Sequence, residues 1–414
     1  MIRLPWLSSF RAKVQTWYPH FGAFMAWLAL LMLVSPRQIH NTTFYVFLLV
    51  PFVLALTGDD VRSLASSWVI RLTALWLVVL WMSPAWTPPI DLSTWATLGR
   101  FGASNFLLLL LAVWLFAADP RRIGTMFLWL GVVGAGIGAV SVVQYFSVPA
   151  DGTRFIIGHW NVNVGAGILG LITVGLVCGP ATNWSMRRRA FASVALAVVL
   201  SFFVVLTASR APVLAAVVSI LFAAATGGSR RIVGATVLLA SALTLLAYAS
   251  GVIDLGNWLA RADAKRFDIW EFYGRLALEH VMVGHGIDQE FKFVVPELRL
   301  DTPHNMFLGN LLYGGLASVV AYVLLMGTSV WVGIDRVRRS GDLLPLALTL
   351  YLFLHGQFES SLPFHGADWR WMYYWLPLAA AATAELALRA SPPAGGTTRI
   401  VVSACPPNNR PSKK

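Results

Sequence analysis

The sequence predicts an all-α polytopic membrane protein of about 12 transmembrane helices, with one long loop that contains short helices. Hydrophobic residues make up 57% of the chain and charged residues 12%, whereas soluble chains carry about 25% charged residues. The apolar residues also form runs close to the ~20 residues that a helix needs to cross a bilayer. The expected spans are residues 20–35, 41–57, 66–83, 101–118, 123–147, 162–180, 190–208, 211–226, 231–250, 304–332, 343–357 and 371–389.

The distribution of Lys and Arg predicts the orientation of these spans. If the N-terminus lies in the cytoplasm, most of the 31 Lys and Arg fall in cytoplasmic segments, as the positive-inside rule requires. Many of the others fall in the long loop, residues 251–303, where the rule is weak. The net charge of +12 is therefore assigned to topology rather than to nucleic-acid binding. Both termini are expected inside, and the long loop outside.

The chain reads as one transmembrane domain, residues 1–390, followed by a short tail. Residues 391–414 are rich in Pro, Gly and Asn and are expected to be a disordered cytoplasmic segment. Cys178 and Cys405 fall in a span and in the tail, so no disulfide is expected. No cleavable signal peptide is recognised at the start of the sequence.

The stretch from Asp301 to Asn310 joins a polar loop to an apolar run, and it contains the first candidate for catalysis. Thr302 suits a helix N-cap and Pro303 suits the first helical position. His304 is therefore expected in the first turn, where the helix dipole disfavours the imidazolium form. A neutral imidazole is able to accept a proton beside an anion bound at the helix end. The alternative is a loop histidine at the membrane surface.

Arg210 lies in a very short connection between two apolar runs, which predicts a tight helical hairpin with Arg210 at its tip. A cation at a helix N-terminus opposes the dipole at a cost of about 0.3–1 kcal/mol. An outer position is also not explained by topology, so an anionic ligand such as a diphosphate is favoured. The alternative is an arginine that extends to the lipid headgroups.

Two further groups lie on the same expected side of the membrane. One combines a cation, an imidazole and two amides within ten residues, a set suited to binding sugar or phosphate: Arg154, His159, Asn161 and Asn163. A helix that begins after an Asn161 N-cap explains the amides equally well. The second is Arg275, which a ladder of Glu271, Arg275 and Glu279 at helical spacing explains as a solvated salt-bridge face.

The long loop and the last outer segment add context. Residues from Arg261 to Val283 have helical periodicity, with Phe267, Trp270, Gly274 or Ala277, and Val281 on one side. A helix with such an apolar side and a charged side is expected to lie along the outer leaflet. The segment from His355 to Arg370 is a candidate rim of the same site. No cofactor and no metal are expected, because no His/Cys cluster has zinc spacing. The Asp288 and Glu290 pair is attributed to chance in an acidic loop.

At these residues the chain resembles the O-antigen ligases (WaaL) of the bacterial O-antigen ligase and polymerase superfamily. The resemblance rests on the run His304 to Leu308 after the long loop, on Ser209-Arg210 with Leu214 four residues on, and on Arg275 in the loop. The twelve-span plan is similar too. The resemblance implies that His304 is a catalytic base and that Arg210 and Arg275 bind a diphosphate. Arg154, His159, Asn161, Asn163 and Asn305 are further candidates for substrate binding.

The resemblance implies a metal-independent, inverting glycosyl transfer at the periplasmic face of a Gram-negative inner membrane. The donor would be O-antigen linked to undecaprenyl diphosphate and the acceptor lipid A-core, in lipopolysaccharide biosynthesis. An O-antigen polymerase is the alternative within the superfamily, because Arg154-x10-Gly165 and Arg275-x10-Gly286 match its pattern. A lipid or polysaccharide transporter is the alternative of another class, although the expected spans carry few charges and no internal repeat is seen.

Overall fold

A computed structural model describes most of the chain. The described residues are 20–34, 37–86, 91–147, 155–158, 161–179, 187–226, 266–295, 298–359 and 370–390, with isolated positions between 234 and 249 and at 362, 364 and 368. The expected span 231–250 and the expected tail, 391–414, therefore lie largely or wholly outside the described residues.

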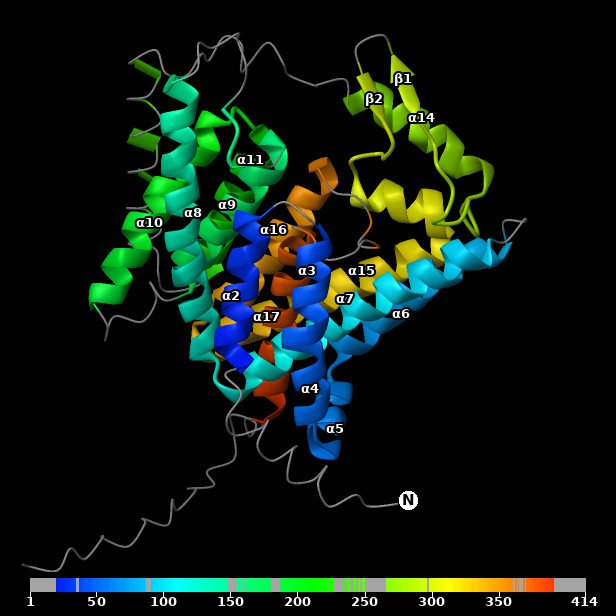
Figure 1. Ribbon diagram of the computed structural model, residues 1–414, viewed down its shortest axis with the longest axis horizontal. Coiled ribbons are helices and arrows are strands. Elements are labelled where there is room, and N and C mark those ends of the chain that lie inside the picture. Colours follow the sequence, from blue (N-terminus) through cyan, green and yellow to red (C-terminus); the bar gives the residue numbers. More distant parts are fainter. Residues whose placement is uncertain are drawn as a thin grey trace, which may run out of the picture.

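Helices form most of the described structure (Figure 1). The first half of the chain contains α2 (His20–Leu33), α3 (Arg37–Thr43), the π-helix η1 (Phe44–Leu49), α4 (Val50–Ala55), α5 (Gly58–Ser66), α6 (Trp68–Met82), the 3₁₀ turn η2 (Ser83–Trp86), α7 (Leu92–Ala118) and α8 (Arg121–Ser147). The second half contains α9 (Val162–Cys178), α10 (Arg187–Leu206), α11 (Arg210–Thr226), α14 (Arg266–Glu279), the strands β1 (Phe293–Val295) and β2 (Leu298–Leu300), α15 (Met306–Ser340), α16 (Leu344–Glu359) and α17 (Arg370–Ala390).

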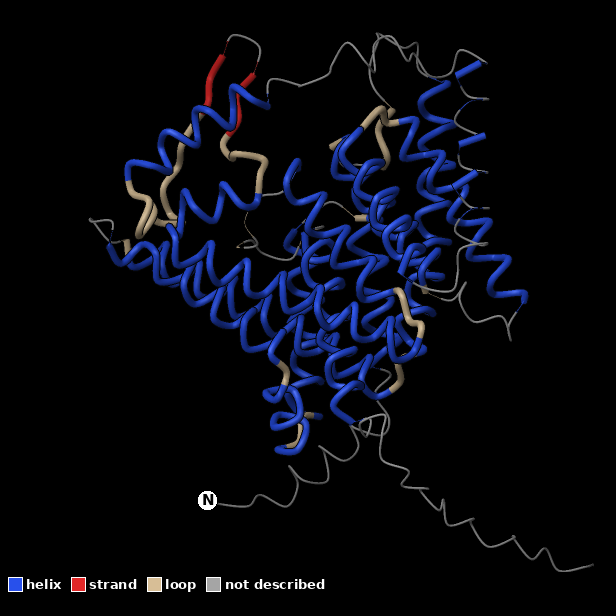
Figure 2. The backbone as a smooth tube through the Cα atoms, turned by 180° about the vertical axis from the view of Figure 1, so that it is seen from behind, coloured by secondary structure: helices blue, strands red, loops and turns tan. Residues whose placement is uncertain are grey.

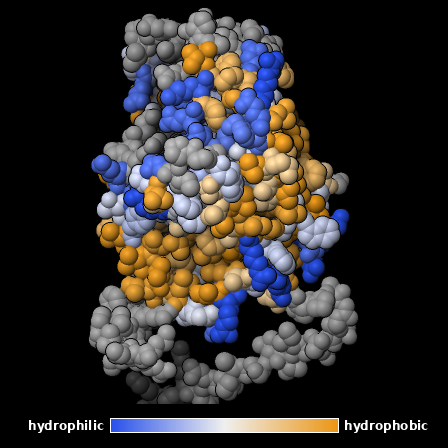
Figure 3. Space-filling model, turned by 90° about the vertical axis from the view of Figure 1, so that its right-hand side faces the viewer, coloured by the Kyte–Doolittle hydropathy of each residue, from blue (hydrophilic) through white to orange (hydrophobic). Residues whose placement is uncertain are grey.

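The helices identify a membrane protein. Within the described residues, six helical segments are long and apolar enough to cross a bilayer: Gln38–Ala55, Trp68–Trp86, Leu92–Ala118, Arg121–Ser147, Arg189–Leu206 and Met306–Ser340. Shorter apolar helices occupy four more segments, such as Val162–Cys178 and Leu344–Phe358. Figure 3 shows one face, on which an apolar region lies between polar side chains above and below it. The predicted class, a helical membrane protein, is confirmed.

Two of the expected spans differ from the helices found. The helix expected from residue 101 begins at Leu92, because the Asp91 carboxylate accepts a hydrogen bond from the Ser93 N–H at 2.9 Å and caps it. The helix expected over 304–332 begins at Met306 and is interrupted at Gly315, whose φ of 62° and ψ of −162° are not helical. Met306 to Gly314 is thus a short helix of its own, followed by a long one that ends at Ser340.

The described part of the long loop contains one helix and a strand pair that the all-α prediction missed (Figure 2). Strands β1 and β2 pair antiparallel, with Phe293 opposite Leu300. The loop helix α14 buries Ile269, Tyr273 and Ala277. Of the side expected to be apolar, Ala277 is buried and Phe267 is exposed.

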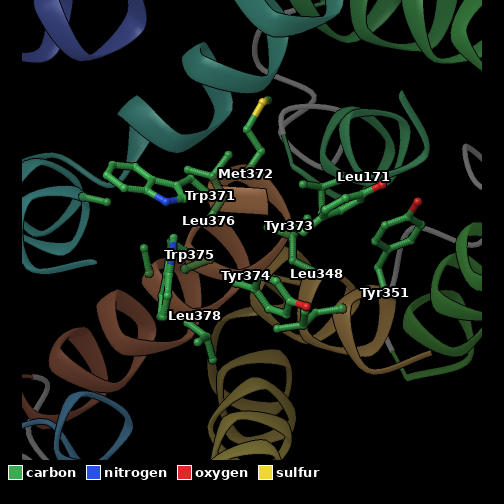
Figure 4. Close-up of a cluster of buried hydrophobic side chains, with 14 of the residues drawn as sticks. Leu171, Leu348, Tyr351, Trp371, Met372, Tyr373, Tyr374, Trp375, Leu376 and Leu378 are labelled. Carbon is green, nitrogen blue, oxygen red and sulfur yellow. The ribbon is translucent and has the colours of Figure 1, made fainter. Parts of the chain in front are cut away.

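Aromatic residues of α16 and α17 form a large part of the core (Figure 4). Tyr351 donates a hydrogen bond to the Gly167 carbonyl at 2.7 Å, and Tyr373 donates one to the Val164 carbonyl at 3.1 Å. Both carbonyls belong to α9. The two tyrosines therefore fix α16 and α17 against the first half of α9, the helix that carries two candidate site residues.

A buried carboxylate joins α17 to the start of α6. Glu385 accepts hydrogen bonds from the Ser67 hydroxyl at 2.7 Å and from the backbone N–H groups of Trp68 and Val69 at 2.9 and 3.1 Å. Arg389 pairs with the same carboxylate at 2.6 Å. Free N–H groups at a helix start attract an anion. Glu385 of α17 therefore caps the start of α6, which is a structural role.

Candidate active site

The connection before Arg210 is a tight turn, as predicted. Helix α10 ends at Leu206 and α11 begins at Arg210. The Thr207 hydroxyl donates to the Val204 carbonyl at 2.6 Å and accepts from the Ser209 N–H at 3.2 Å. Ala208, between them, has a φ of 53°. This left-handed conformation costs a residue with a Cβ about 1–2 kcal/mol, so the hydrogen bonds around it hold a strained turn that starts α11.

The same turn is joined to the start of α9. Ser209 donates its hydroxyl to the Asn163 side-chain oxygen at 2.8 Å. Asn161 is the N-cap of α9, as predicted, and its side-chain oxygen accepts from the Asn163 N–H at 3.0 Å. The structure thus brings Asn161 and Asn163 together with the residue that precedes Arg210. Arg154 and His159 lie outside the described residues.

His304 does not lie in the first turn of a helix, so the predicted position was wrong. The N-cap is Asn305 rather than Thr302, and its side-chain oxygen accepts from the Leu308 N–H at 2.9 Å. Its amide nitrogen donates to the Gln357 carbonyl at 3.2 Å, at the end of α16. Asn305, rather than Thr302, is the N-cap because its side chain both caps α15 and bonds to the end of α16. His304 precedes the cap, half-buried, with a φ of 47°.

The short helix that follows His304 is closed by two glycines. Gly284 approaches this end of the helix so closely that a Cβ added to it would lie 2.6 Å from the Gly315 nitrogen and 2.5 Å from the Tyr313 carbonyl carbon. Both glycines have positive φ, 72° for Gly284 and 62° for Gly315. The His285 N–H donates to the Leu312 carbonyl at 2.8 Å, and the Gly286 N–H to the Tyr313 carbonyl at 3.0 Å. The loop after α14 therefore satisfies the carbonyl groups at the end of this helix.

A buried amide fixes the same short helix laterally. Asn310 is fully buried. Its side-chain oxygen accepts from the Trp76 indole N–H at 2.6 Å and from the Ser318 hydroxyl at 2.6 Å. Its amide nitrogen donates to the Met306 carbonyl at 2.8 Å. Asn310 thus ties the segment that carries His304 both to α6 and to the long part of α15.

Arg275 forms the surface salt bridge that was given as the structural alternative to a binding role. It forms an ion pair with Glu271, and the two side chains are 77% and 62% exposed. Exposed pairs of this kind contribute about 0–1 kcal/mol. Arg275 could therefore exchange Glu271 for another anion, but the ion pair itself does not indicate a ligand.

The last turn of α16 accepts hydrogen bonds from two other parts of the site. The sequence indicated this segment only as a candidate rim. The Gln357 carbonyl holds Asn305, and the neighbouring Phe358 carbonyl accepts a hydrogen bond from Arg266 of α14. Arg266 also lies over the Phe358 ring, with its guanidinium carbon 5.7 Å from the ring centre. Helix α16 packs against α9, α11 and α15 as well. It therefore contacts α9, which carries Asn163, α11, which begins at Arg210, and α15, which follows His304, and it reaches α14 through Arg266. Nothing in the sequence distinguished Arg266 from other loop cations.

The candidate residues supply an imidazole, His304, and two cations, Arg210 and Arg275, whereas Asp368, between α16 and α17, is a buried acid. Tyr273, the buried phenol of α14, donates to the Phe291 carbonyl at 3.1 Å. Burial raises the pKa of Tyr273 to about 12, so this phenol stays neutral near pH 7. The imidazole of a histidine such as His304 is a side chain that is able to accept a proton near pH 7. No family model and no curated protein matches the chain.

Proposed function

We propose that this chain is an O-antigen ligase, a glycosyltransferase of the Gram-negative inner membrane. It would transfer O-antigen polysaccharide from undecaprenyl diphosphate to lipid A-core at the periplasmic face. The proposal takes its reaction and substrates from the resemblance of the sequence, and its candidate residues from sequence and geometry together.

One structural observation supports it most. Among the described residues other than glycine, a positive φ occurs at Ala208 and at His304. Strained backbone of this kind persists where the surrounding structure holds it, and it clusters at functional sites. Ala208 is two residues from Arg210, the proposed diphosphate ligand, and His304 is the proposed base. The resemblance had named His304 itself and Arg210, two residues after Ala208, without any knowledge of backbone geometry.

The proposed step is a direct displacement. His304 takes the proton of an acceptor sugar hydroxyl, and the oxygen attacks the anomeric carbon of the donor. The bond from that carbon to the diphosphate oxygen breaks, and undecaprenyl diphosphate leaves with the electron pair. Arg210 and Arg275 stabilise the growing charge on the diphosphate, so the step requires no metal. The anomeric configuration inverts because the attack is from the opposite side.

The proposed topology has twelve spans, with both termini in the cytoplasm and residues 251–303 in the periplasm. The charge pattern of the sequence supports it. Apart from 231–250, helices occupy every expected span. Cysteine at position 264 (Ala264→Cys) should react with an impermeant thiol reagent added to spheroplasts. Labelling only after lysis would refute this topology.

The test of function is a reconstituted reaction. Purified protein is mixed with lipid-linked O-antigen and lipid A-core, and the products are separated on gels. The proposal predicts that O-antigen becomes attached to the core, and that excess chelator leaves the reaction unchanged. Extension of the lipid-linked chains without core would identify a polymerase instead. Failure to form either product with a folded protein would refute glycosyl transfer of this type.

A further inference from the structure

The last turn of the loop helix α14 and the turn after it expose four apolar side chains that are close together in the sequence. Leu278 is 68% exposed and Met282 is 65% exposed, and Val281 and Val283 beside Met282 are exposed as well. We call Leu278 and Val281–Val283 the apolar edge. These residues precede the short helix of α15 and lie outside the segments that are long and apolar enough to span a membrane. Water contact with such a group is unfavourable, so a cover is expected.

The apolar edge is attached to the ends of two membrane-spanning segments. The Trp86 indole N–H donates to the Val283 carbonyl at 2.7 Å, and Trp86 is the last residue of the spanning segment that begins at Trp68. The Leu316 N–H, at the start of the long part of α15, donates to the Val281 carbonyl at 2.9 Å. In Figure 1 the turn after α14 meets the right-hand ends of α6 and α7, whereas β1 and β2 extend away from them.

Tryptophans at these helix ends indicate the depth of the edge in the membrane. Trp81 and Trp95 stack with ring centres 5.4 Å apart, and each indole N–H donates to the backbone carbonyl of the other residue, at 3.2 and 2.8 Å. Trp86 lies one turn further along, partly exposed. Tryptophan concentrates where lipid headgroups meet the hydrocarbon region. The hydrogen bond from Trp86 therefore places Val283 at that boundary.

We propose that the apolar edge inserts into the lipid leaflet on its side of the membrane and holds the loop helix α14 at the bilayer surface. The partner is lipid because the edge continues the surface of a spanning segment at the depth marked by tryptophan. Two polar residues, Glu279 and His280, lie between Leu278 and Val281 and are exposed, and the His280 ring lies 4.6 Å from the His285 ring. Peripheral helices bind membranes in this way, with an apolar side buried below the headgroups. This inference does not depend on the chemistry proposed above.

The inference has a direct test by fluorescence quenching. Full-length protein without its natural cysteines (Cys178→Ala, Cys405→Ser) receives one cysteine, at Met282→Cys, and an environment-sensitive dye. The matched control is Val294→Cys on β1, where the side chain is 66% exposed. Each protein is placed in nanodiscs that hold a single copy, with and without brominated phospholipid. A second edge variant, Leu278→Cys, guards against a local folding defect at position 282.

The proposal predicts that brominated lipid quenches the dye at positions 282 and 278 several times more strongly than at position 294, with blue-shifted emission at the edge. Equal quenching at the edge and at the control would overturn it. Blue-shifted emission without quenching would also overturn it, because protein rather than lipid would then cover the edge.

Discussion

Replacement of Asn310 by leucine should loosen the segment that carries His304. Leucine has the same branching as asparagine and tolerates a helix. The change removes the hydrogen bonds and also forces a small shift, because a methyl group needs more room than an oxygen held at 2.6 Å from its two donors. The Trp76 indole N–H and the Ser318 hydroxyl both donate to the Asn310 side chain in the native structure. A serine hydroxyl in a helix is able to turn to the carbonyl four residues earlier. The indole N–H of the fully buried Trp76 has no such freedom.

The expected cost follows from this single stranded donor. A buried polar group without its partner costs about 1–3 kcal/mol. Hydrogen bonds between transmembrane helices average about 0.6 kcal/mol and reach about 1.7 kcal/mol, so the lower half of the first range applies. The effect on transfer should be larger than the effect on stability, because a displacement of about 1 Å at a reacting group is able to cost about 100-fold in rate.

Denaturant unfolding in mixed micelles and the transfer assay measure these two effects. Thr73→Val is the matched control, since Thr73 is buried in the same helix as Trp76 and its hydroxyl donates to the Val69 carbonyl of that helix at 2.7 Å. Trp76→Phe removes the stranded donor, so in a double-mutant cycle Asn310→Leu and Trp76→Phe together should cost less stability than the sum of the two single changes. If Asn310→Leu is as stable and as active as the control, the assigned role of Asn310 is wrong.

Three further predictions concern other parts of the site. Arg210→Lys keeps the charge but loses the planar group that grips two phosphate oxygens, so transfer should fall well below wild type; normal transfer would make Arg210 a simple membrane anchor. Gly284→Ala should lower the free energy of unfolding by more than about 1 kcal/mol, because its Cβ would meet the Tyr313 carbonyl, whereas Gly327→Ala has open space and should not. Arg275→Gln should leave stability within about 0.5 kcal/mol of wild type, since its ion pair is exposed, while transfer falls; unchanged transfer would remove Arg275 from the site.

Local chemistry was predictable from the sequence. Asn161 caps α9, and the turn before Arg210 is as short as expected, because both depend on neighbours within a few residues. Apolar runs likewise predicted most helices. These features need no knowledge of the rest of the fold.

The features that the sequence did not predict depend on contacts between segments that are distant along the chain. Asn305 caps α15 with the help of Gln357, which is 52 residues away, and this displaced His304 from the expected first turn. The break at Gly315 depends on its close approach to Gly284. The strands β1 and β2 are three residues each, too short for an alternating pattern to be recognised. The dipole argument for a neutral His304 loses its basis with the corrected position.

The most direct test of the central claim measures donor binding and transfer separately for His304→Ala. The variant should fold, because His304 precedes the helix cap and is half-buried. If His304 is the base, the affinity for lipid-linked O-antigen should remain close to wild type, while the maximal rate of transfer to lipid A-core falls by about 10²–10⁴-fold. Weaker donor binding with an intact maximal rate would contradict the claim, because His304 would then be a ligand of the diphosphate and not the base.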